Sequence, residues 1–205
     1  MKIRSISFDT SFLLKDSILI DDAIKKIEDD GIPCFITKTV VSELDQLKIW
    51  GRITDKDLNR AIKRYKRVHT TVIDFKNRLL SNGFGKMCTT SMEKYHGIKP
   101  EDIVNDCNIL VSTLKNGVDL FLSEDFHFTS RITKEVINEI SNAACSEFHM
   151  MCDTHLYSVD VKTFLEAYNN GDLNLEIVES RIKNITKKGK RFDNFQQFVL
   201  LINIF

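Results

Sequence analysis

Residues 3–14 read Ile-Arg-Ser-Ile-Ser-Phe-Asp-Thr-Ser-Phe-Leu-Leu, an alternating segment that runs into an acid and then into apolar residues. The alternation of apolar and polar residues over 3–8 predicts a short strand that ends just before Asp9. A carboxylate held beside apolar segments is costly to ionise unless an opposite charge neutralises it. This stretch therefore predicts both the first strand of the fold and the first acid of a site.

The rest of the chain alternates between strand and helix patterns. The expected elements after the first strand are a helix at 17–30 that Gly31 ends, a strand at 34–36, a helix capped by Thr37 or Thr39, one or two helices over 54–80, a break at 81–85, an irregular stretch at 87–99, a helix at 100–115, a strand at 119–123, a helix at 159–168, and a strand or helix at 173–182. Because parallel strands need crossover helices, this order predicts an α/β fold, a three-layer α/β/α sandwich with a central, mostly parallel sheet. We expect residues 1–140 to form this domain and 141–205 to form a C-terminal extension packed on it.

Four acids lie at the edge of a predicted strand or on the apolar face of a predicted helix: Asp9, Glu43, Asp106 and Asp125. In open parallel sheets, ligands collect at the carboxyl ends of the strands, near a point where the strand order reverses. If the fold brings the four carboxylates together there, a hard divalent cation such as Mg²⁺ or Mn²⁺ would neutralise them, and such a cluster can hydrolyse phosphodiesters. Each acid also has an ordinary alternative, because Asp9 could cap a helix, Glu43 and Asp106 could face solvent, and Asp125 could belong to a turn.

Charge and cysteine content restrict the environment more than the function. The 29 basic and 29 acidic residues cancel, but residues 52–78 hold nine Lys or Arg against three Asp. A second basic cluster lies at 183–191 and an apolar run at 198–205, which could be a last buried element or a docking strand. Five cysteines without regular spacing, together with the absence of an evident leader or a long apolar span, predict a cytoplasmic protein without a membrane segment.

With these residues in view, the chain resembles the PIN-domain ribonucleases, which include VapC-type toxins, over about residues 1–130. The motifs that carry the resemblance are Phe8-Asp9-Thr10-Ser11-Phe12-Leu13-Leu14 after the first strand, Glu43 on the helix after the second, Asp106 with Ile109 and Gly117, and Ser123, Asp125 and Phe128 after the last strand of this region. His127 stands where many members of the family carry a further Asp.

The resemblance implies a metal-dependent endoribonuclease, either toxin-like or RNA-processing, that uses Mg²⁺ or Mn²⁺. Its catalytic and metal-binding acids would be Asp9, Glu43, Asp106 and Asp125. The hydroxyl groups of Thr10 and Ser123 would hold these carboxylates in place by hydrogen bonds. RNA would lie over basic residues of the 52–78 stretch, namely Arg60, Lys63, Arg64 and Arg67. An antitoxin protein and a second copy of the chain are possible partners. The alternative is a PIN-fold module that binds RNA or protein without cutting.

Three further features have competing explanations. Asp102, one helical turn before Asp106, could face the same cleft or could simply suit the positive end of its helix. Cys145, His149, Cys152 and His155 suggest zinc, but their spacing matches no common zinc site, and a buried thiol with surface histidines is the simpler explanation. Trp50 could stack on a nucleic-acid base or fill a packing position.

Overall fold

The computed structural model describes residues 1–182 of the chain. It has an α/β fold around a five-stranded sheet in the order β3-β2-β1-β4-β5, and all the pairings in this sheet are parallel. The strands are β1 (Ile6–Phe8), β2 (Cys34–Thr37), β3 (Thr71–Ile73), β4 (Leu120–Leu122) and β5 (Tyr157–Val159). The predicted fold class is confirmed, and the sheet has two more strands than the sequence pattern indicated.

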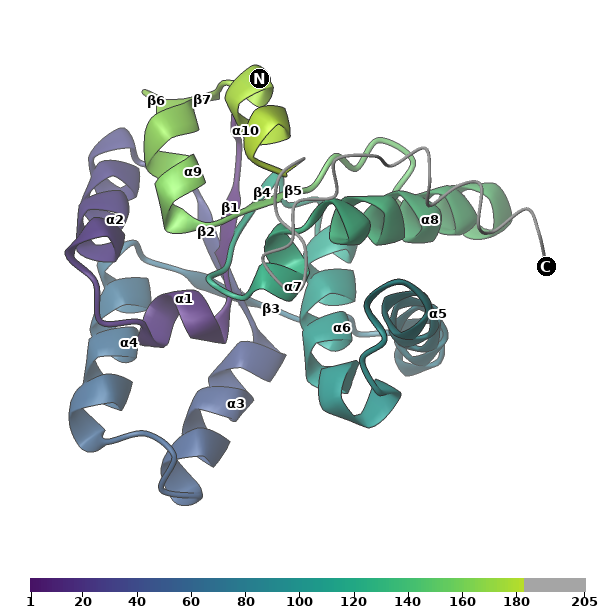
Figure 1. Cartoon of the computed structure of the whole chain (residues 1–205), viewed down its shortest axis with the longest axis horizontal. Helices are drawn as coiled ribbons and strands as arrows, with labels where there is room; N and C mark the ends of the chain where they lie inside the picture. Colours follow the sequence, from purple (N-terminus) through teal and green to yellow (C-terminus); the bar gives the residue numbers. More distant parts are fainter. Residues whose placement is uncertain (183–205) are drawn as a thin grey trace.

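Helices cover both faces of the sheet. Figure 1 shows α1, α2 and α4 on one side and α5, α6 and α8 on the other. The helices are α1 (Thr10–Leu14), α2 (Ile18–Asp30), α3 (Lys38–Ile49), α4 (Asp55–Arg67), α5 (Arg78–His96), α6 (Pro100–Lys115), α7 (Phe126–Thr129), α8 (Arg131–Phe148), α9 (Val161–Ala167) and α10 (Leu175–Ile182), and a small antiparallel pair joins β6 (Tyr168–Asn169) to β7 (Asp172–Leu173).

The central strands are buried on both faces, as expected for a parallel sheet between helices. All three residues of β1 and of β4 are buried, and Phe8 and Phe121 are fully enclosed. Each such side chain contributes about 1.5–3 kcal/mol relative to an exposed one. The sheet is therefore a rigid platform, and residues that directly follow β1 and β4 are held in fixed positions.

The local signals at several helix ends explain why these predictions succeeded. Gly31 adopts the left-handed conformation with φ of 63° and ends α2, as the pattern over 17–30 predicts. Thr37 caps α3 by accepting a hydrogen bond from the backbone of Val40. Pro100 opens α6, which ends at Lys115 as expected.

The prediction for residues 54–99 was wrong in three places. The helix ends at Arg67, and a short edge strand, β3, follows it with Val72 57% exposed, so the strand carries little apolar pattern. The break expected at 81–85 lies instead in the first half of α5, which runs from Arg78 to His96, and the stretch expected to be irregular, 87–99, is helical up to His96. Gly85 lies within α5 where a Cβ atom would stand 3.1 Å from the side-chain oxygen of Asn108 on α6, so this glycine serves close helix packing.

The region after residue 130 is more regular than its sequence pattern suggests. Helix α8 was not predicted, and the helix expected at 159–168 consists of the end of β5, the helix α9 and the first residue of β6. Residues 173–182 contain the end of β7 and the helix α10. Since β5 pairs with β4 and α9 packs against α2, this part of the chain shares one body with the earlier elements. The basic cluster at 183–191 and the apolar run at 198–205 lie outside the described residues.

Cys145 and Cys152 form a disulfide, whereas Cys34, Cys88 and Cys107 are buried free thiols. The expectation that the cysteines are free thiols is wrong for this pair, and the disulfide makes both sulfurs unavailable as zinc ligands. Disulfides are typical of oxidising compartments, so this bond does not support the cytoplasmic location, which stays a prediction. No helix within residues 1–182 combines the length and the apolar character needed to cross a membrane.

Candidate functional site

Two of the four predicted acids follow neighbouring strands at a reversal of strand order. The chain proceeds from β1 to β2 and β3 on one side and then returns to place β4 on the other side of β1. Asp9 directly follows β1, and Asp125 lies three residues after the last residue of β4. The backbone N–H of Asp9 donates to the carbonyl of Leu122 at 2.9 Å, which ties the two strand ends together. This is the position at which open parallel sheets collect ligands.

Asp9 is buried, with 4% of its surface exposed, and its carboxylate is held by two serines. Its Oδ2 atom accepts hydrogen bonds from Ser11 Oγ at 2.5 Å and from Ser123 Oγ at 2.8 Å. Burial raises the pKa of Asp9 to about 6. The hydrogen bonds from the two serines lower this pKa, and the negative charge of Glu43 raises it further. Asp9 also caps α1, so the ordinary alternative for this residue is true as well and does not compete with a role in a site.

Glu43 lies in the second turn of α3, and its carboxylate contacts Thr10, the residue that follows Asp9. Thr10 Oγ1 donates to Glu43 Oε2 at 2.5 Å, and Thr10 itself is buried. Each of the two residues predicted to orient the acids therefore contacts an acid: Ser123 donates a hydrogen bond to Asp9, and Thr10 donates one to Glu43. The contact orients Glu43, which is partly buried, toward the end of β1.

Asp106, on α6, shows that the acids share one electrostatic environment. Burial raises its pKa to about 8, and the negative charges of Asp9, Asp125 and Glu43 add to the rise in that order. A carboxylate responds to other charges in this way only when they lie within a few ångströms to about a Debye length. The four acids, which come from four different elements, therefore repel one another across a common space.

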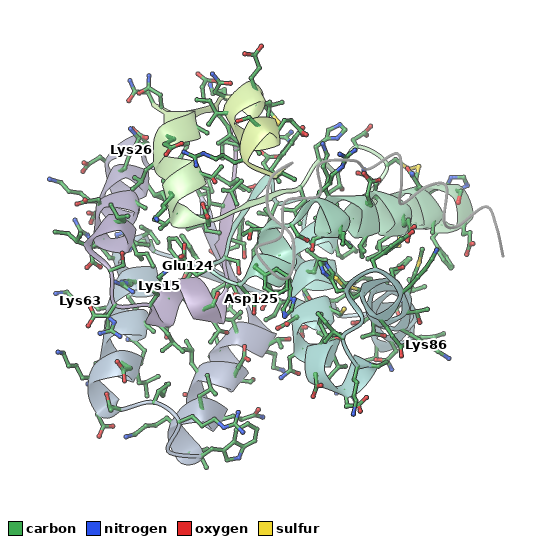
Figure 2. The ribbon with its side chains drawn as sticks, viewed as in Figure 1. Lys15, Lys26, Lys63, Lys86, Glu124 and Asp125 are labelled. Atoms are coloured by element: carbon green, nitrogen blue, oxygen red, sulfur yellow. A yellow bond between two sulfur atoms is a disulfide. The ribbon has the colours of Figure 1, made fainter. Side chains whose placement is uncertain are left out.

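Asp125 is partly exposed and is held by hydrogen bonds of both its side chain and its backbone. It caps α7, with Oδ1 accepting a hydrogen bond from the His127 N–H at 2.9 Å, and its own N–H donates to Ser123 Oγ at 3.0 Å. His127 Nε2 lies 3.7 Å from the same Oδ1 atom. Figure 2 shows Asp125 at the centre of the molecule, between α1 and α6. His127 thus adjoins the predicted site.

The carboxylate oxygens of the four acids fit Mg²⁺ or Mn²⁺ chemically, but their side chains do not converge on one metal position in this structure. Within residues 1–182, no three His, Cys, Asp or Glu side chains are placed to hold a metal ion together. The donors are nevertheless all carboxylate oxygens, and the raised pKa of Asp106 reflects burial first and then the negative charges of the other acids, which a divalent cation would offset. Because Mg²⁺ keeps several of its waters, bridging waters or small side-chain rotations would have to close the remaining distances.

The residues predicted to bind RNA are largely engaged elsewhere. Arg64 is 3% exposed, and its guanidinium bonds to Asp21 and to the carbonyls of Leu13 and Lys15. It holds the connection between α1 and α2, so we remove it from the proposed RNA-binding set.

The other three predicted RNA-binding residues remain at the surface. Arg60 donates to the carbonyl of Leu14 and pairs with Asp57, and Arg67 pairs with Glu28. Lys63 is exposed, and Figure 2 shows it on the outer side of α4, far from Asp125. The basic helix therefore does not present its positive charge to the acids.

Sequence reasoning missed two residues that shape the site. Ser11 bonds to Asp9 and also accepts a hydrogen bond from the Glu124 N–H at 3.0 Å, so it links the ends of β1 and β4. Glu124 pairs with Lys15 and accepts from the backbone N–H of Val161 at 2.8 Å. A serine two residues after a buried aspartate is the pattern of a local Asp-to-Ser hydrogen bond, and it could have identified Ser11. Glu124 follows β4 beside β5, a strand that was not predicted, and it contacts the first residue of α9, which lies within the helix expected at 159–168. Asp102 is exposed.

A pocket of about 240 Å³ lies at the opposite end of the sheet, around the beginnings of β2 and β3. Its lining includes Arg67 and Glu28, which pair with each other, and none of the four acids. The predicted acidic site therefore lies away from this pocket.

Comparison with known proteins gives no independent identification, since no protein-family model, curated protein or solved structure matches this chain.

Proposed function

We propose that this protein is a metal-dependent endoribonuclease of the PIN-domain type, which hydrolyses phosphodiester bonds of RNA. The observation that supports it best is the raised pKa of Asp106, to about 8, under the charges of Asp9, Asp125 and Glu43. Asp9 and Asp125 follow the two strands at which the strand order reverses, and burial is the first cause of the raised pKa of Asp106, before the charges of the other acids. Perturbed carboxylates of this kind cluster at functional sites.

In this proposal Asp9, Asp106 and Asp125 hold the cation, with Glu43 as a fourth ligand or as the group that orients water. The bound ion would supply a water of lowered pKa and would stabilise negative charge on the phosphate. Ser11 and Ser123 occupy Oδ2 of Asp9, which leaves Oδ1 for a ligand. Thr10 occupies Oε2 of Glu43, which leaves Oε1 to accept a hydrogen bond from an attacking water. The water would form the new P–O bond as the bond to the leaving oxygen of the RNA breaks.

Cleavage of a fluorogenic RNA during a titration with Mn²⁺ tests the proposal. We expect cleavage that depends on the metal and falls at least roughly 100-fold in Asp9→Asn, because the variant keeps the shape of the side chain and loses its charge. Asp102→Asn is the matched control, since Asp102 is an exposed acid on the helix that carries Asp106. Cleavage that survives Asp9→Asn would remove the proposed site.

Two observations favour a second candidate, a PIN-fold module that binds RNA or protein without cutting. The described acids are not arranged to hold a metal as they stand, and His127 occupies the place of the family's further Asp. Such a module would bind RNA equally well with and without Mn²⁺ and would leave it intact. In either case a toxin-like role, an antitoxin partner and a homodimer follow only from the resemblance.

A further inference from the structure

The turn between α3 and α4 exposes two large apolar side chains at its tip, which we define as residues 48–56. Ile49 is 79% exposed and Trp50 is 63% exposed. Aromatic side chains of this size normally bury 150–250 Å² in a core or an interface. Single exposed apolar residues are ordinary, but an adjacent Ile and Trp at a projecting tip mark a contact surface. The packing role considered for Trp50 does not account for this exposure.

The charge around this tip is positive. It carries Lys48, Arg52 and Lys56 against Asp55, which gives three positive charges and one negative charge, an excess of two. Lys48 pairs with Asp55 at 2.8 Å, while the guanidinium carbon of Arg52 lies 5.5 Å from the centroid of the Trp50 ring. A cation beside an exposed indole is an arrangement that suits a base on the ring and a phosphate on the guanidinium.

The tip also aligns with the acidic site. Trp50 follows Glu43 by seven residues, and residues seven apart lie on the same face of a helix, two turns from each other. At about 1.5 Å per residue, the two Cα atoms are roughly 10 Å apart along the helix axis. Figure 1 shows α3 running from the edge of the sheet near α1 and α6 out to the turn that leads into α4. A strand of nucleic acid that contacts Trp50 could therefore reach Glu43 within a few nucleotides.

We propose that the tip is a docking element for single-stranded RNA, in which one base stacks on Trp50 and the adjacent phosphate contacts Arg52. The proposal rests on the proposed ribonuclease function and names the surface that holds its substrate. It replaces α4 as the main RNA contact, because the guanidinium groups of Arg60, Arg64 and Arg67 already bond within the protein. The proposal commits to RNA because the exposed indole offers a stacking face and Arg52 beside it offers a positive charge for the adjacent phosphate.

The chain offers a direct probe, because Trp50 is its only tryptophan. A base stacked on the indole quenches its fluorescence, so excitation at a wavelength that tyrosine does not absorb reports on the tip alone. The titration uses the full chain with Asp9→Asn, which keeps the RNA intact, and a short single-stranded oligoribonucleotide. We expect saturable quenching that weakens steeply with added salt. Absence of quenching while RNA binding is seen by fluorescence anisotropy of a labelled oligonucleotide would overturn the proposal.

Variants separate stacking from apolar docking. Trp50→Ala should weaken RNA binding roughly 5- to 150-fold, the range for loss of one base–aromatic stack, whereas Trp50→Phe should retain most of the affinity. Ile49→Ser is the matched control, since it removes the neighbouring apolar side chain and leaves the aromatic face in place. Equal losses in Trp50→Ala and Ile49→Ser, or self-association that Ile49→Ser abolishes, would overturn the proposal in favour of a protein contact. Both side chains replaced are exposed, and unchanged thermal unfolding verifies that each variant is folded.

The failure of this inference and the failure of the ribonuclease proposal give different results. If RNA is cleaved and Trp50 is not quenched, the enzyme proposal stands and the docking site is wrong. If Trp50 is quenched and no metal supports cleavage by the wild-type chain, the docking site stands and the enzyme proposal is wrong. In an active enzyme, Trp50→Ala should raise KM and leave kcat nearly unchanged, because stacking at the tip does not involve the reacting atoms.

Discussion

Replacing Asp106 with Asn should stabilise the metal-free protein in alkaline solution. The native structure raises the pKa of this carboxyl from 3.8 to about 8, through burial and through the charges of Asp9, Asp125 and Glu43. An ionised Asp106 is therefore unfavourable in the native state and unhindered in the unfolded chain. Asparagine keeps the shape of the side chain and never carries the charge, so the variant avoids the penalty.

The sign follows from proton binding in the two states. Between about pH 4 and pH 8 the native state binds more protons at Asp106 than the unfolded chain, so the free energy of unfolding falls as the pH rises. The stabilising proton is fully present below about pH 4 and is lost as the pH passes through about 8. Asp9, whose pKa is raised to about 6, adds a contribution of the same sign that is complete at lower pH.

A rise of the pKa from 3.8 to about 8 corresponds to about 6 kcal/mol, at 1.36 kcal/mol for each tenfold change in the proton equilibrium. Asp106 is half-buried, and solvent and salt screen part of the repulsion, so roughly 2–3 kcal/mol is the expected difference between variant and wild type at about pH 9. At about pH 3, below the pKa of 3.8 that the carboxyl has in the unfolded chain, Asp106 is protonated in both states and the two proteins should differ by less than about 0.5 kcal/mol.

Urea unfolding at several pH values, in the presence of a chelator, measures this difference. Asp102→Asn is again the control, because it removes an exposed acid from the same helix and should change stability by no more than the 0.3–1 kcal/mol of a helix-end charge at any of these pH values. A wild-type curve that is flat between about pH 5 and pH 9, or an Asp106→Asn variant no more stable than wild type at the upper end, would show that the acids do not share a site.

The same protein should respond to a cation. Mg²⁺ or Mn²⁺ at about 100 times its dissociation constant should stabilise the wild type by about 2.7 kcal/mol. Asp106→Asn should lose most of this gain, because the variant has one ligand and one negative charge fewer. A variant that is stabilised by metal as strongly as the wild type would place the cation elsewhere in the molecule.

Three further outcomes concern stability. Arg64→Met should cost about 3–5 kcal/mol in urea unfolding, because it leaves several main-chain carbonyls and Asp21 without their donor, while Lys63→Met on the exposed face of the same helix should stay within about 0.5 kcal/mol. Reduction of Cys145–Cys152 should lower stability by about 2.5 kcal/mol from loop entropy, with intact-mass analysis after thiol alkylation as the check that the bond exists. Gly83→Ala should raise the thermal midpoint by the equivalent of about 1 kcal/mol, because no atom lies within 4 Å of the added methyl group and alanine favours the helix.

The elements that the sequence predicted correctly are those with strong local signals. The helix α2 carries an uninterrupted apolar stripe and ends at a left-handed glycine, and β1 and β4 are compact apolar strands. Because Asp9 directly follows β1 and Asp125 lies three residues after β4, their approach to each other could be expected from the order of elements alone. The positions of the acids thus followed from the parts of the chain that were easiest to interpret.

The elements that were missed depend on contacts between distant segments. Strand β3 exists because Phe35, Ile36 and Thr37 of β2 pair with it, although its own residues are mostly exposed. Helix α5 continues through Gly83 and Gly85, and its close packing on α6 outweighs their low helix propensity. Neither effect can be read from local pattern, since both come from a partner elsewhere in the chain.

The basic stretch at 52–78 shows why charge in the sequence is a poor guide to a binding surface. Arg64 lies in the middle of the stretch, yet it is a buried connector whose guanidinium satisfies main-chain carbonyls that no backbone donor reaches. A guanidinium offers five donors in a fixed plane, which suits this structural use as well as it suits phosphate. The positive charge that remains open to a polyanion therefore depends on which arginines the fold has already used. By that criterion, Arg52 beside the exposed Trp50 is a stronger candidate for RNA contact than the arginines of α4.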